Sequence, residues 1–122
     1  MNLIKKCLLI FLVVFPTMLL AEARLQNLAT RGFIGTGDNV LIGGLIITGD
    51  APKTILIRAR GPALTVAGVV GAISDTEILL FSGSDIIDRN DDWQTHENAN
   101  QVPVGLQPTD SRESVIVKTL VP

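Results

Sequence analysis

Residues 53–60 read KTILIRAR and lie between two breakers of regular structure, GDAP at residues 49–52 and GP at residues 61–62. Side chains alternate between the two faces of a strand, which places Ile55 and Ile57 on one face and Leu56 on the other. Proline lacks a backbone N–H, so the flanking prolines limit the length of any ladder. This stretch predicts a β-strand, which is the element on which our assignment of the fold depends.

The rest of the chain follows the same pattern of short runs rich in Val, Ile, Leu and Thr, separated by Gly, Asp, Asn and Pro. Such punctuation is typical of antiparallel β proteins. We expect further strands at residues 25–34, 40–48, 77–81, 85–88 and 113–120, turns at 35–39 and 82–84, and a loop with a short helical turn at 61–75. The predicted fold is all-β, an antiparallel β-sandwich of jelly-roll or immunoglobulin-like type.

The first 21 residues have the pattern of a secretory signal peptide. Lys5 and Lys6 precede an apolar run that ends in small residues, with cleavage expected after Ala21 or Ala23. The run is too short for a typical membrane span, although an uncleaved N-terminal anchor is the alternative. The sequence therefore predicts a signal peptide at residues 1–21, one domain at residues 22–122, no membrane span after cleavage, and a secreted or cell-surface location, with the periplasm as an alternative.

Composition excludes several classes of function. The one cysteine, Cys7, belongs to the leader, so residues 22–122 have neither disulfides nor thiolate ligands. Those residues carry 8 basic and 12 acidic side chains, a net charge of −4. We therefore expect no nucleic-acid partner, because phosphate backbones require a basic surface.

Several motifs along the chain resemble one family. They are RLQNLATRG at residues 24–32, GTGDNVLIGG at 35–44, LIRARGPAL at 56–64, LLFSG at 79–83, NDDWQ at 90–94, and PT and ES at 108–109 and 113–114. In this order they resemble an uncharacterised repeat module of large exported proteins of environmental Gram-negative bacteria. The second half of the chain is also similar to the C-terminal β-sandwich domains of secreted bacterial peptidases. The resemblance implies an extracellular β-sandwich and no particular activity.

Both families continue with a Gly-x-Tyr strand that this sequence lacks, so the resemblance implies a copy without its last strands. The strand predicted at residues 113–120 would then have a free edge. Free edges accept added strands from other chains. We therefore expect a partner β-strand at this open C-terminal edge.

The strongest candidate site is DRNDD at residues 88–92, with oxygen-bearing side chains at Asp88, Asn90 and Asp92. This alternation resembles part of a calcium loop, and Asp85, Asp91 and Glu97 could complete a cage. An EF-hand would require glycine where Trp93 stands, and glutamate where Ala99 stands. A solvated turn with capping side chains is the alternative interpretation.

Trp93 could present an exposed aromatic ring to a sugar or polymer, or it could fill the core. Catalytic patterns are weak, because His96 is the only histidine and no Gly-x-Ser-x-Gly elbow is present. We therefore expect no catalytic residues and no cofactor apart from the alternative of Ca²⁺. The expected function is a non-enzymatic exported module with a structural or adhesion role, and the alternative is a calcium-dependent carbohydrate- or polymer-binding accessory module.

Overall fold

A computed structural model describes residues 27–122, so the predicted signal peptide lies outside the described residues. The chain divides into two units, residues 1–31 and 32–122, and every helix and strand described below belongs to the second. Within the described part, no helix has the length and apolar character needed to cross a membrane. The elements are β1 Lys53–Ala59, α1 Pro62–Val66, β2 Ile78–Ser82, β3 Asp85–Asn90, β4 Ser114–Leu120 and three 3₁₀ turns, η1 Trp93–Thr95, η2 Ala99–Gln101 and η3 Val104–Leu106.

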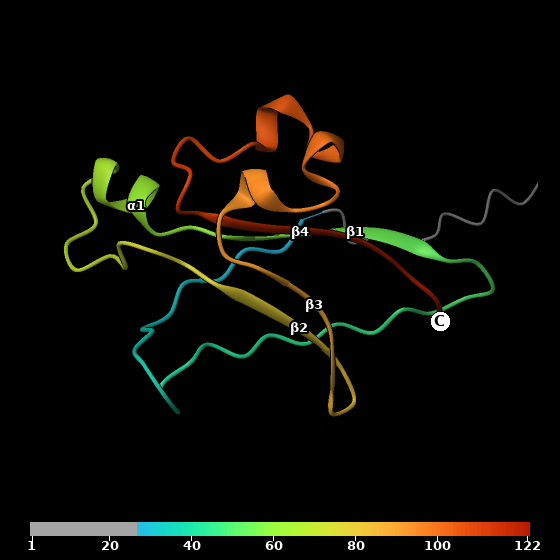
Figure 1. The fold of residues 1–122 in the computed structure, drawn as a ribbon. Helices are drawn as coiled ribbons and strands as arrows, with labels where there is room; N and C mark the ends of the chain where they lie inside the picture. Colours follow the sequence, from blue (N-terminus) through green and yellow to red (C-terminus); the bar gives the residue numbers. More distant parts are fainter. Residues whose placement is uncertain (1–26) are drawn as a thin grey trace, which may run out of the picture. The chain divides into compact units, whose positions relative to one another are not determined.

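The first sheet pairs β1 with β4, which lie side by side although they are far apart in sequence (Figure 1). The strands are antiparallel, and their register runs from Lys53 opposite Leu120 to Ala59 opposite Ser114. Near one end, the hydroxyls of Thr54 and the facing residue on β4 are 2.8 Å apart. The strands predicted at residues 53–60 and 113–120 are confirmed.

The second sheet is the hairpin of β2 and β3, which were also predicted as strands. Gly83 in the turn has φ +61°, a conformation that glycine adopts without steric cost. The register shifts between Leu80 and Phe81, so one residue bulges from the ladder. Two small antiparallel sheets and little helix confirm the β-rich class.

The core is built on β4, where Val115, Ile116 and Val117 are all buried. Val115 and Val117 form a cluster with Val102, against which Leu56 and Trp93 pack. Ile116 points to the opposite face because strand side chains alternate. Both faces of β4 are therefore covered, which explains why its apolar residues form a continuous run and do not alternate with polar ones.

The loop after β1 is fixed by one carboxylate. Glu113 is fully buried, and its Oε1 accepts hydrogen bonds from the backbone N–H groups of Gly61 at 3.1 Å and Ala63 at 2.9 Å. These donors lie at the start of α1, where backbone N–H groups have no partner within the helix. The carboxylate thus joins the residue before β4 to the segment after β1. The helical turn predicted in this loop is confirmed.

The strands predicted at residues 25–34 and 40–48 are wrong for the part of the chain that the structure describes. Residues 27–52 contain no strand, and Ile42 and Ile46 are exposed. A strand requires a neighbouring chain segment for its backbone hydrogen bonds, and Gly43 and Gly44 further weaken the extended run. Within residues 27–52, the turn predicted at 35–39 is confirmed, with a hydrogen bond from the Gly35 N–H to the Asn39 carbonyl.

Candidate functional site

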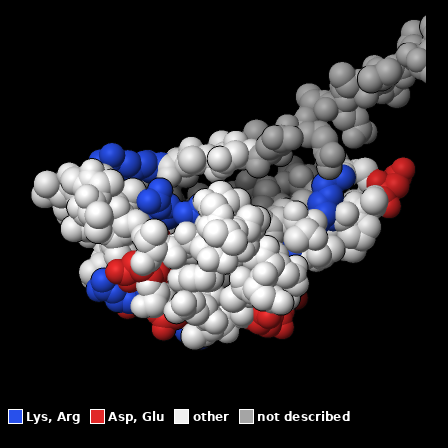
Figure 2. All heavy atoms as spheres, turned by 90° about the horizontal axis from the view of Figure 1, so that it is seen from above, with Lys and Arg blue, Asp and Glu red and all other residues white. Residues whose placement is uncertain are grey.

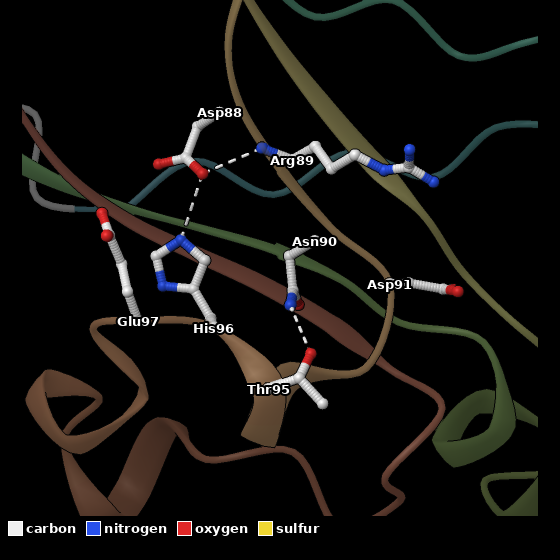
Figure 3. A pocket seen from close by; sticks show the side chains of 7 residues that line it. All are labelled: Asp88, Arg89, Asn90, Asp91, Thr95, His96 and Glu97. Carbon is white, nitrogen blue, oxygen red and sulfur yellow. Dashed lines mark hydrogen bonds and ion pairs between the residues drawn. The ribbon is translucent and has the colours of Figure 1, made fainter.

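The hollow that we consider as a candidate site lies where β3 leads into η1, and has a volume of about 360 Å³ (Figure 3). It collects four of the predicted metal ligands, Asp88, Asn90, Asp91 and Glu97, but neither Asp85 nor Asp92 lines it. Thr95 and His96, from η1 and the residue after it, complete the wall together with Arg89.

Asp88 is the centre of the polar contacts in this hollow, and its side chain is only 11% exposed. Its Oδ1 accepts a hydrogen bond from the Arg89 backbone N–H at 2.8 Å, and its Oδ2 is 3.2 Å from Lys118 Nζ on β4. The same ammonium group is 3.9 Å from Glu97 Oε1. Lys118 therefore links β4 to β3 and to the loop that follows β3.

His96 is held on both sides of its ring, and its side chain is 2% exposed. The backbone N–H of Asn98 donates to His96 Nδ1 at 3.1 Å, so Nδ1 carries no hydrogen. The hydrogen is therefore on Nε2, which lies 3.4 Å from Asp88 Oδ1 and points at it in Figure 3. Both ring nitrogens of His96 are therefore engaged by other groups of the protein.

The contacts of Asp88 predict that the folded chain loses stability in acid. Burial acts to raise the pKa of Asp88, but the hydrogen bond with Lys118, the Arg89 backbone N–H and the charge of Lys118 outweigh burial and lower the pKa. A carboxyl whose pKa is lower in the folded chain stabilises the fold above its unfolded pKa, and this contribution is lost as the pH falls through the folded pKa. We expect the urea midpoint to decrease below about pH 4.

The pH dependence should be weaker in the Asp88→Asn chain, since the amide does not titrate. Urea titrations of both chains between neutral and acidic pH measure this difference. Lys118→Met serves as a second variant, because it removes the main cause of the lowered pKa while leaving the carboxyl in place. Identical pH profiles for the parent chain and the Asp88→Asn chain would contradict the prediction.

Asn90 is buried and joins β3 to β4. Its Oδ1 accepts from the backbone N–H of Val115 at 2.8 Å, and its Nδ2 donates to the backbone carbonyl of Asp92 at 2.9 Å. Two further contacts follow along β4: the Trp93 N–H donates to the Glu113 carbonyl at 2.9 Å, and Asn98 Nδ2 donates to the Val117 carbonyl at 3.1 Å.

These three contacts fall on alternate residues, Glu113 just before β4 and Val115 and Val117 within it. We call the segment that makes them, residues 90–98, the edge loop. Alternate residues of a strand direct their backbone groups to the same side. The edge loop therefore occupies the outer edge of β4 from residue 113 to residue 117. The partner strand predicted at the C-terminal edge would have to displace these hydrogen bonds. Contrary to the prediction, this part of the edge is therefore already occupied.

The predicted calcium ligands are placed as follows. Asp88 and Asn90 line one hollow, but their oxygens are already engaged with Lys118, the Arg89 backbone and Val115. Partial desolvation and the neighbouring acids Asp75, Asp92 and Glu77 raise the pKa of Asp91, which points away from Asp88 in Figure 3. Among residues 27–122, no group of three or more His, Cys, Asp or Glu side chains is placed to hold a metal ion.

The interactions of the edge loop were mostly not visible in the sequence. Trp93 is half-buried and packs on the cluster of Val102, Val115 and Val117, in the position of a core residue. His96, Asn98 and Lys118 were not predicted as members of the site. The one available signal was the spacing of His96, eight residues after Asp88, across a turn that brings the two side chains together.

Comparisons with family models, with curated proteins and with solved structures found no match to this chain.

Proposed function

We propose that the chain is a non-enzymatic β-sandwich module of an exported protein, with a structural or adhesion role outside the cell or at its surface. The proposal is supported by the hydrogen bonds and ion pairs that its polar side chains form. In the hollow, Asp88, Asn90 and His96 bind other parts of the same chain, which accounts for their burial without a ligand. Buried polar groups of this kind fix one arrangement of the elements.

The β-sandwich assignment is supported by the contacts between the two sheets. Lys118 of the first sheet is paired with Asp88 of the second, and Asn90 binds the backbone of Val115. These contacts join β3 to β4, while Val115 and Val117 of β4 pack against Val102 and Trp93. A jelly-roll or immunoglobulin-like arrangement would extend each sheet by further strands.

The observation that carries the adhesion role is an exposed apolar surface on the β2–β3 hairpin. Leu79, Phe81 and Ile86 are 44%, 52% and 57% exposed, and Phe81 pairs directly with Ile86. Contiguous apolar surface on a soluble protein marks contact sites for other molecules. The face in Figure 2 adds that charged side chains form small separate groups on a mostly uncharged surface.

The test is attachment of cells that express the full chain to polystyrene and to one another. We expect attachment above the empty-vector level, and a return to that level in the Phe81→Ser/Ile86→Ser chain. The matched control is Val70→Ser/Val104→Ser, which removes two apolar side chains that are exposed outside the hairpin. Equal attachment of both double variants, with circular dichroism showing that each is folded, would overturn the proposal.

The calcium-dependent binding module remains the second proposal, and it requires Asp88 and Asn90 to exchange their present partners for a metal ion. A ligand that binds only the folded chain raises its melting temperature. Thermal unfolding of the full chain in CaCl₂ and in EDTA separates the two proposals. The structural module is expected to melt at the same temperature in both solutions, whereas a rise in calcium would favour the binding module.

A further inference from the structure

The segment on either side of Arg31 is exposed and has no regular structure. Residues 27–34 form neither helix nor strand, and no hydrogen bond among the described residues involves any of them. Leu28 is 76% exposed and Phe33 is 91% exposed, and Arg31 and Gly32 between them are also exposed. Exposed backbone of this kind is where proteolytic cleavage concentrates.

The residues of this segment specify a class of protease. Extended peptides bind through their backbone hydrogen-bonding groups, and proteases select the residue before the cleaved bond by the chemistry of a pocket. Trypsin-like enzymes carry a carboxylate in this pocket, which pairs with a basic side chain. Arg31 supplies a guanidinium that forms no ion pair with a described carboxylate, and Gly32 after it has no side chain.

A second Arg-Gly pair shows what the structure adds to the sequence. Arg60 is also exposed and is followed by Gly61. The backbone on either side of it is engaged, however, because Ala59 pairs with Ser114 on β4, and the Gly61 N–H donates to the buried Glu113 carboxylate at 3.1 Å. A protease could bind this second pair only after these contacts had broken. The two pairs are therefore alike in sequence and different in accessibility.

We propose that the Arg31–Gly32 bond is a processing site for an arginine-specific endoprotease of trypsin type. Water is consumed as the amide bond breaks, which leaves a carboxylate on Arg31 and an amino group on Gly32. The chain divides into its two units at this bond, and every described helix and strand follows it. The product is a module that begins at Gly32 with all four strands intact. This cut is distinct from the predicted signal-peptide cleavage, which follows a small residue.

The experiment is digestion of the full chain with a small amount of trypsin, with mass spectrometry of the products over time. The product that begins at Gly32 is compared with the product that begins at Gly61. We expect the first to form at least about a hundredfold faster, because cleavage after Arg60 requires local opening of β1 and the start of α1. Peptides of residues 27–36 and 56–65 give the cleavage rates without a fold, and the ratio for the chain is corrected by theirs.

Arg31→Gln and Arg60→Gln are the matched variants, since each removes one Arg-Gly bond. We expect Arg31→Gln to abolish the product that begins at Gly32, and Arg60→Gln to leave its rate unchanged. Circular dichroism of that product should give the melting temperature of the intact chain. Equal corrected rates at the two Arg-Gly bonds, or loss of the cooperative transition after the cut, would overturn the inference. Neither result alters the expected cell attachment, which depends on the hairpin.

Discussion

Replacing Glu113 with alanine is expected to lower the free energy of unfolding by about 4 kcal/mol. The carboxylate accepts hydrogen bonds from the backbone N–H groups of Gly61 and Ala63 in a buried site. Each buried donor that loses its partner costs roughly 1–3 kcal/mol, and alanine offers no acceptor to either one. Urea denaturation of the Glu113→Ala chain, followed by circular dichroism, measures the change.

Glu113→Gln is the control for this prediction, because its side-chain carbonyl can take the place of Oε1. The second carboxylate oxygen has no hydrogen-bond partner among the described residues, so its replacement by an amide removes no contact. We expect the Gln chain to remain within about 1 kcal/mol of the parent chain. If the Ala and Gln chains were equally unstable, the buried charge and not the two hydrogen bonds would explain the loss.

Gly61→Ala is expected to lower the free energy of unfolding by about 3 kcal/mol, for a different reason. A Cβ atom at this position would clash with the backbone carbonyl of Ile73, and would lie 2.8 Å from Ile73 Cγ2 and 3.0 Å from Thr76 Cγ2. A backbone carbonyl cannot rotate away as a long side chain can, so the loop itself must shift. Adding atoms to a packed site typically costs 1–3 kcal/mol, and contact with backbone places this variant near the upper end.

The matched control is Gly105→Ala, where an added Cβ atom would have no neighbour within 4 Å. We expect its free energy of unfolding to stay within about 0.5 kcal/mol of the parent chain, as for ordinary surface changes. Urea denaturation of both glycine variants provides the comparison. An unchanged midpoint for Gly61→Ala would mean that the segment at Ile73 is free to move, and would contradict the packing described above.

The sequence predicted those elements whose signals are local. β1 is bounded by prolines and rich in β-branched residues, and the β2–β3 hairpin has a glycine turn between two apolar runs. The short helical turn follows a Gly-Pro pair, a typical position for proline at a helix start. Each of these features is decided within a few residues, so no knowledge of distant contacts was needed.

The pairing partners of distant segments could not be predicted from the sequence. Residues 40–48 have the composition of a strand but no ladder partner among the described residues, and composition cannot supply one. Asn90 was predicted as a calcium ligand because asparagine oxygens bind calcium, and the sequence did not reveal that its oxygen accepts a hydrogen bond from the backbone of Val115, 25 residues later. His96 and Lys118 meet at Asp88 only after β3 and β4 have come together. Periodicity along the sequence carries no information on such pairings.

The edge loop on β4 limits how many strands from other chains the sheet can add. Sheets with two open edges can add chains without limit, which is the route to fibrils. In the β1–β4 sheet, the edge loop occupies one side from residue 113 to residue 117, so addition is confined to the other. The edge loop therefore counts against the addition of strands at both edges of this sheet, which growth into a fibril requires.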